Sequence, residues 1–208
     1  MSETAGNSQA EKIYLFDDHS IESLDEGKVG RKGLSLFNLV HMDAPTPDFF
    51  VLSPRVFREY IDTVFTKKAE SLVGKGKNPE GSEVSSALTR ADFDVEFQKE
   101  LLRAYTRISG FTDSWVSVRS SVSMPGRPDV SFSGIFGTQL NVRGFENLKK
   151  AIKQVYATMF TDGVVAYAVG EGVELAEVSL GIVVQKMVQA EVSGVAFTVD
   201  PITQDNKR

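Results

Sequence analysis

The chain has 208 residues, of which 41% are hydrophobic and 25% charged, so it is long enough and apolar enough to fold around a substantial core. The formal net charge of −5 argues against nucleic acid as a partner, because polyanions bind to broad basic surfaces. The absence of cysteine excludes disulfides, thiolate metal sites and cysteine nucleophiles.

Nothing in the sequence points to a membrane. No apolar run approaches the roughly 18 residues needed to cross a bilayer. The first residues, MSETAGNSQAEK, lack the basic start and apolar centre of a signal peptide. A cytoplasmic location without a membrane partner is therefore the default expectation.

The first part of the chain predicts mainly helices. Residues 1–11 are small and polar and are expected to form a disordered tail, with order beginning near KIYLFDD. We expect a short helix over 32–42 and a short strand over 49–52. The next helix is expected to begin with Ser53 as its N-cap and Pro54 as its first residue.

Two segments of different character follow. Residues 66–86 mix Lys, Gly, Ser and Glu without periodicity and predict a solvated loop. Residues 90–110 repeat large apolar side chains at helical spacing and end in Gly110, which favours a helix stop. The stripe indicates a helix packed on a core rather than a binding groove.

After Gly110 the pattern becomes strand-like. Alternating and β-branched residues predict strands over 114–120, 138–142, 180–188 and 194–200, the last two joined by the turn-like QAEVS. A helix is expected over 146–160. The sequence thus predicts an α+β fold with a helix-rich N-terminal lobe over 12–112, a strand-rich lobe over 113–208, and a cleft between them.

Residues 118–142, VRSSVSMPGRPDVSFSGIFGTQLNV, combine an arginine just past a strand with many serines and glycines. Phosphate groups bind where positive charge, free backbone N–H groups and small residues coincide. By composition alone this stretch is either a simple connection or a phosphate cradle. It matches neither of the common glycine-rich phosphate-loop spacings.

Several motifs, in order, resemble one family. VGRKGLSL at 29–36, the VRSS, SFSG and NVRG elements around 118–144, and IVVQKMVQAEVSGVAFTVDPIT at 182–203 are similar to the N-terminal nucleotide-binding domain of phosphoenolpyruvate synthase, pyruvate phosphate dikinase and rifampicin phosphotransferase. The resemblance spans roughly residues 24–203. It implies an ATP-grasp fold, in which ATP is clamped between two lobes.

The resemblance also implies roles for individual residues. Lys32 and Arg119 would contact the ATP phosphates and carry the catalytic charge stabilisation. The backbone of 134–138 would form a lid over the triphosphate, with Gly134 and Thr138 at its ends. Gln185, Lys186 and Met187 would lie on the strand that lines the adenine, where the hinge backbone would read the edge of the base. Met187 and Val184 would supply apolar contacts.

Each of these residues has a simpler alternative. Lys32 would otherwise be a solvated lysine at a helix start, Arg119 a strand-end ion pair, and Gln185 an outward-pointing strand residue. The two histidines gain no support from the motifs, and His19 is expected in a loop and His41 at a helix end.

The sequence also departs from the family pattern. Gly30 and Arg31 stand where the family has two glycines, which adds a cation beside Lys32. The segment VSMPGRPDV resembles the dikinase version, whereas SFSG resembles the synthase version. The residues that hold Mg²⁺ in the family, its phosphohistidine domain and its pyruvate-binding barrel lie further along than residue 208. We therefore expect the front part of an ATP-grasp domain, C-terminally incomplete.

The expected function is the ATP-binding portion of a phosphotransferase that resembles phosphoenolpyruvate synthase, with ATP and Mg²⁺ as cofactors. In such enzymes ATP phosphorylates a histidine on another domain, which passes the group to pyruvate. The alternatives are part of a dikinase, part of a rifampicin-phosphotransferase-like kinase, or a non-catalytic nucleotide-binding protein. This chain alone is not expected to complete the reaction.

Overall fold

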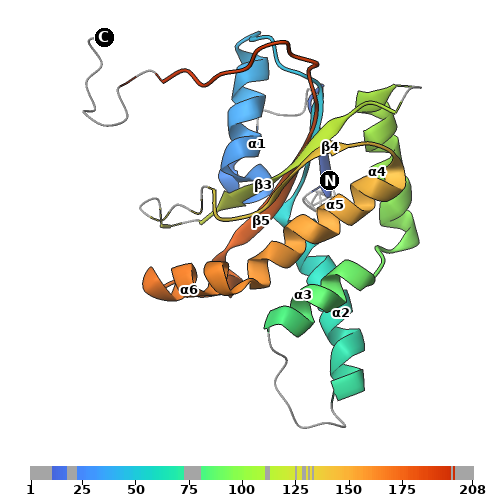
Figure 1. Ribbon diagram of the computed structural model, residues 1–208, viewed down its shortest axis with the longest axis vertical. Helices are drawn as coiled ribbons and strands as arrows, with labels where there is room; N and C mark the ends of the chain where they lie inside the picture. Colours follow the sequence, from blue (N-terminus) through green and yellow to red (C-terminus); the bar gives the residue numbers. More distant parts are fainter. Residues whose placement is uncertain are drawn as a thin grey trace, which may run out of the picture.

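The computed structural model describes residues 11–17, 23–72, 81–110, 113–124, 126–127, 130, 132, 134–197 and 199, without the side chains of 66–72. These residues form one five-stranded sheet with helices on both faces (Figure 1). Helix α1 lies on one face, and α2, α4 and α5 lie on the other. The fold is α+β, as the sequence predicts. Within the described ranges, no helix has the length and apolar character needed to span a membrane.

The sheet is antiparallel throughout and follows the order β1-β2-β5-β3-β4. Its strands are β1 (Ile13–Leu15), β2 (Phe49–Leu52), β3 (Val116–Ser123), β4 (Thr138–Val142) and β5 (Ser179–Lys186). The last strand in the chain therefore lies at the centre, between β2 and β3. The expected boundary between residues 112 and 113 would cut through this sheet, because β1 and β2 precede it and the other three strands follow it.

Six α-helices are described. They are α1 (Glu26–His41), α2 (Pro54–Leu72), α3 (Gly81–Arg90), α4 (Val95–Ser109), α5 (Phe145–Ala157) and α6 (Asp162–Gly170). Two short 3₁₀ turns, η2 (Thr158–Phe160) and η3 (Leu175–Glu177), flank α6. His41 ends α1, as expected, whereas His19 lies outside the described residues.

Strand alternation divides the interior into two clusters. In β2, Phe50 and Leu52 join the larger cluster with α2, α4 and α5, while Phe49 and Val51 join a smaller one under α1. Because successive side chains of a strand point to opposite faces, this assigns every strand position to a face. On β5, Val183 lies on the α1 face and Val184 on the opposite face.

The helix ends agree only in part with the predicted caps. Gly110 ends α4 with φ 66°, as expected, and Asp94 caps its start by accepting the N–H of Phe97 at 2.9 Å. The prediction that Ser53 caps α2 is wrong for its side chain. Its hydroxyl is buried and has no hydrogen-bond partner among the described residues.

Two further sequence predictions are corrected. The expected loop 66–86 is helical at both ends, since α2 continues to Leu72 and α3 begins at Gly81. Val84 and Leu88, one turn apart, bury the inner face of α3, which loop-like composition conceals. The expected strand 194–200 is absent from 194–197, where the apolar side chains are exposed, so no hairpin with β5 forms in the described part.

Two buried tyrosines of the core, Tyr60 and Tyr156, differ in their hydrogen bonding. Tyr60 donates to the carbonyl oxygens of Leu88 and Ala91, while the fully buried hydroxyl of Tyr156 has no partner among the described residues. Their rings lie 6.1 Å apart. Burial raises the pKa of both phenols, so both are neutral in the folded protein.

We predict opposite effects of deleting the two hydroxyls. Tyr156→Phe removes an unpaired buried polar atom and should raise the free energy of unfolding by about 1 kcal/mol. Tyr60→Phe removes the hydrogen-bond donor of two carbonyl groups and should lower the free energy of unfolding by about 1–2 kcal/mol. Urea denaturation of both variants tests this, and an equal loss in the two would contradict the assignment.

Candidate functional site

Helix α1 is interrupted where it crosses β3. Gly30 has non-helical backbone angles (φ 70°, ψ 169°) inside the helix. The Ser121 hydroxyl accepts the N–H of Gly33 at 3.0 Å and donates to the carbonyl of Val29 at 2.7 Å. These are the two groups that a regular helix would join directly, so a side chain from the sheet is inserted into the helical ladder.

The close approach leaves no room for a side chain at Gly30. A Cβ there would overlap the carbonyl oxygen and the hydroxyl of Ser121, far inside van der Waals contact. The positive φ separately favours glycine. Gly30, the first glycine of VGRKG, is therefore required by the contact between α1 and β3.

Lys32 follows this interruption and points its amine back to β3. Its Nζ donates to the carbonyl oxygen of Ser120 at 2.8 Å. Burial lowers the pKa of Lys32, and the positive charge of Arg119 lowers it further. The side chain is half-buried and forms no ion pair with any described carboxylate. Lys32 is thus not simply a solvated lysine at a helix start.

Arg119 lies on β3, exposed, on the face that α1 covers in part. It sits opposite Thr138 of β4 and Val183 of β5. Within the described part of the chain its guanidinium has no hydrogen bond and no ion pair. The alternative of a strand-end ion pair therefore finds no partner there, and its charge adds to that of Lys32.

The remaining predicted residues divide between this face and others. Thr138 is exposed at the start of β4, opposite Arg119, and Gln185 pairs with Ser117, two residues along β3 from Arg119. Two residues correspond to roughly 7 Å along a strand. Gly134 is exposed with φ 79°, four residues before Thr138.

The end of β5 is held by backbone contacts. Gln185 Nε2 donates to the carbonyl of Pro47 at 3.4 Å, and the N–H of Met187 donates to the carbonyl of Trp115 at 2.8 Å. The Met187 sulfur accepts the N–H of Asn141 at 3.2 Å. Lys186 lies on the opposite face from Gln185, with its amine 4.0 Å from Asp48 Oδ2.

Val184 is a correction to the sequence analysis. It is fully buried in the larger cluster, on the sheet face away from Lys32 and Arg119. Because adjacent strand residues alternate, Val184 and Gln185 cannot line the same surface. An apolar contact between Val184 and a ligand beside Arg119 is therefore excluded.

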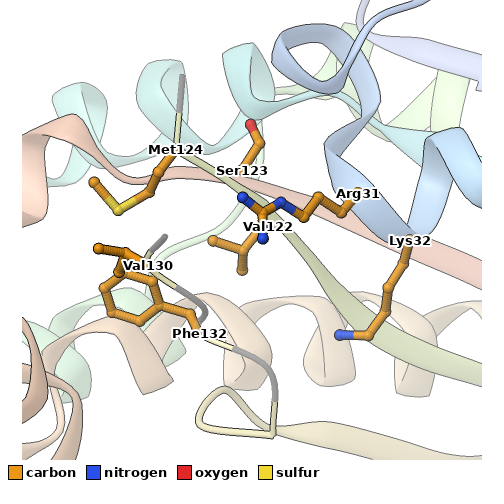
Figure 2. A pocket seen from close by; sticks show the side chains of 7 residues that line it. All are labelled: Arg31, Lys32, Val122, Ser123, Met124, Val130 and Phe132. Carbon is orange, nitrogen blue, oxygen red and sulfur yellow. The ribbon is translucent and has the colours of Figure 1, made fainter. Parts of the chain in front are cut away.

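A pocket adjoins Lys32 and its neighbour Arg31, and Arg119 does not line it. Figure 2 shows the side chains of Arg31 and Lys32 reaching into a cavity of about 190 Å³, whose other walls are Val122, Ser123, Met124, Val130 and Phe132. Arg31 is paired with Glu26 at 3.3 Å, which leaves Lys32 as the unpaired cation of this rim among the described residues. The buried Ser123 hydroxyl has no described partner.

The apolar wall of this pocket is the part that the sequence analysis missed. Met124 and Phe132 lie in the SMPG and SFSG segments, which were marked as departures from one family branch. Their large side chains were the available signal. No periodicity relates two residues of an irregular segment to a helix start about 90 positions earlier, so the sequence does not bring them together.

The described residues do not offer a metal site. No cluster of three or more His, Asp or Glu side chains occurs among them. A carboxylate-rich shell is the usual environment for Mg²⁺. These side chains therefore do not fit a bound Mg²⁺ by themselves, and no catalytic step is assigned to one.

A larger hollow of about 590 Å³ lies elsewhere, between β4 and α5. Arg143 lies over the ring of Trp115 there, 5.7 Å from its centroid, and Lys150 lines the same hollow. None of the predicted site residues lines it. It is the competing location for an anionic ligand on the described surface.

The geometry defines a class of site: two neighbouring cations without a carboxylate partner among the described residues, on one face of an α+β sheet, with Lys32 beside a partly apolar pocket. The sequence matches the family model described as "Pyruvate phosphate dikinase, AMP/ATP-binding domain" over residues 26–208. The chain belongs to this family.

Curated proteins with similar sequences are named as phosphoenolpyruvate synthases or phosphotransferases. A probable phosphoenolpyruvate synthase of Archaeoglobus fulgidus is 33% identical over 94% of this chain and 27% of its own length. The rifampicin phosphotransferase of Bacillus cereus is 31% identical over 93% of this chain and 23% of its own length. The phosphoenolpyruvate synthase of Escherichia coli is 29% identical over 94% of this chain and 26% of its own length. The chain spans about a quarter of the length of these relatives.

We predict that Gly30→Ala is severely destabilising. The new Cβ overlaps Ser121 and forces a positive φ on a residue that resists it, which should cost about 3–5 kcal/mol of unfolding free energy. Gly172→Ala is the matched control, since Gly172 has φ 63° but open space around its Cα. It should cost only about 1–2 kcal/mol. Equal losses by denaturant titration would contradict the close approach.

Proposed function

We propose that this chain binds ATP, with the triphosphate over Lys32 and Arg119, as the nucleotide-binding portion of a phosphotransferase. The observation that carries the proposal is the pair of neighbouring cations without a carboxylate partner among the described residues. A folded protein gains nothing from repulsion between two like charges, and the arrangement becomes favourable when an anion lies between them.

The two side chains suit different parts of a triphosphate. The exposed Arg119 presents a planar fork that can span two oxygens of one phosphate. Lys32 supplies a compact charge and already uses one of its three donors on Ser120 O, which leaves two for phosphate oxygens. Thr138, opposite Arg119, adds a hydroxyl donor on the same face.

The base would lie toward the end of β5. Gln185 and Met187 continue the row from Arg119 on that side, and Met187 offers a polarisable surface for a planar ring. The hinge backbone around Lys186 and Met187 would read the edge of the base. The lid formed by 134–138 would close over the phosphates. We propose an ATP-grasp arrangement for the site as a whole.

The reaction that we propose for the whole protein is of the phosphoenolpyruvate synthase type: ATP phosphorylates a histidine of another domain, which transfers the group to pyruvate. In such a reaction Lys32 and Arg119 hold the phosphates in place and stabilise their developing charge. Mg²⁺ would supply further charge neutralisation from ligands outside the described residues. The 31% identity to rifampicin phosphotransferase supports a second candidate, in which the donor site is the same and the acceptor is a small molecule.

The donor site can be tested by calorimetric titration with ATP. Arg119→Ala and Lys32→Met should each weaken binding about 10- to 100-fold, the effect of losing one charge-assisted contact. Arg90→Ala, at the exposed end of α3, and Lys150→Met, in the hollow beside α5, are the charge-matched controls. Unchanged affinity in the first two, or loss only with Lys150→Met, would refute the proposed location.

The lowered pKa of Lys32 predicts a pH dependence of stability. Between this lowered pKa and the ordinary lysine value of about 10.4, the unfolded chain binds more protons than the folded one. This group therefore makes the free energy of unfolding rise with pH across that window. Buried tyrosines such as Tyr60, with raised pKa values, act in the opposite direction above about pH 10.

The readout is the difference between wild type and Lys32→Met, because the tyrosines are common to both. Urea denaturation at several pH values should show a steeper rise for wild type as pH increases toward 10. At neutral pH, Lys32→Met should be at least as stable as wild type although it has lost ATP affinity. A wild-type curve parallel to that of the variant would show that Lys32 is not held in a costly environment.

A further inference from the structure

The hydroxyl of Ser121 stands out because it bonds only to the backbone of another element. Ser121 is fully buried on β3, and both of its hydrogen bonds cross to α1, one to Val29 and one to Gly33. A buried hydroxyl needs hydrogen-bond partners, but the two groups that it contacts would satisfy each other in a regular helix. The effect of this contact is therefore on the backbone of α1.

We propose that Ser121 is a positioning residue for Lys32: its hydroxyl, inserted between the carbonyl of Val29 and the N–H of Gly33, fixes the turn of α1 that holds the lysine amine against β3. The inference rests on the proposed function, because the positioned amine is the one that we assign to the phosphates. Ser121 itself would not touch the ligand.

The geometry supports this link at three consecutive points. Gly30, inside the turn, contacts the Ser121 carbonyl so closely that no side chain fits. Gly33 closes the turn through the hydroxyl, and Lys32, directly before it, donates to Ser120, the residue before Ser121. Helix and strand are therefore joined by adjacent residues on both sides, and the turn sets the position from which the Lys32 side chain reaches β3.

Removing the hydroxyl changes the turn in a defined way. Without it, the groups at Val29 and Gly33 either bond directly, which tightens the turn toward a regular helix, or take up water. Both outcomes shift Lys32 relative to Ser120 O. The amine would then be more hydrated, and its distance from Arg119 would increase.

The test uses two independent readouts on the full chain, carried out on Ser121→Ala. The first is the pKa of the Lys32 amine, followed by NMR of its side chain. The charged groups that face this amine are Arg119 on β3 and, on its own helix, Arg31, which is paired with Glu26. We expect the pKa to rise toward the ordinary lysine value in the variant. The second readout is ATP affinity, expected to fall about tenfold.

Ser53→Ala is the matched control. It also deletes a buried serine hydroxyl, but one without a hydrogen-bond partner among the described residues, and it follows β2, which β5 separates from β3 in the sheet. It should change neither readout. If Ser121→Ala does not fold, Ser121→Cys keeps a weaker donor and acceptor at the same position, and the same shifts are expected with smaller size.

The two readouts separate the two proposals. A folded Ser121 variant with the Lys32 pKa of wild type overturns the positioning role, even if its ATP affinity is reduced, because the loss would then be merely structural. If the pKa rises but wild type itself does not bind ATP, the positioning role stands and the proposed function fails.

Discussion

The site depends on one close contact, the crossing of α1 over β3 at Gly30 and Ser121. A helix that packs on a sheet through side chains normally stays several ångströms above the strands. Here the backbone of Gly30 meets the backbone of Ser121, which requires a residue without Cβ and a break in the helix. The break in turn leaves two backbone groups unpaired, and the Ser121 hydroxyl satisfies both. The location of Lys32 follows from this contact.

The electrostatics of the site support the proposal of an anionic ligand. A half-buried lysine beside an arginine, with no described carboxylate to balance them, lowers the stability of the free protein. Elsewhere on the molecule the described cations commonly have carboxylate partners, as Arg107 has in Asp17 and Lys153 in Asp92. The contrast explains how a chain of net charge −5 could bind a polyphosphate: the positive charge is local.

The sequence predicted best where the signal is local. The apolar stripe of α4 with Gly110 at its end, and the alternating residues of β3, were found because they depend on neighbours in the chain. The strand order was not predictable, since nothing local places β5 between β2 and β3. The segment 194–197 has a strand-like pattern but pairs with nothing described, because a strand forms only when a partner is available.

The same distinction holds for the site. Lys32 and Arg119 were predicted through motifs, and the structure places them near enough for the charge of Arg119 to lower the pKa of Lys32, although their function stays a proposal. The assignment of Val184 failed for a reason already present in the sequence: it neighbours Gln185 on one strand, and the two must face opposite sides. The partners of Ser121 could not be predicted, because a hydroxyl has no preferred partner that the sequence would indicate.

In our account Lys32 and Arg119 repel each other in the free protein, and a bound anion relieves this repulsion. The most direct test is the pKa of the Lys32 amine in three states: free wild type, free Arg119→Met, and wild type with saturating ATP. The pKa should be lowest in free wild type, higher when the arginine charge is removed, and higher again when phosphates surround the amine. The same value in all three states would contradict the account.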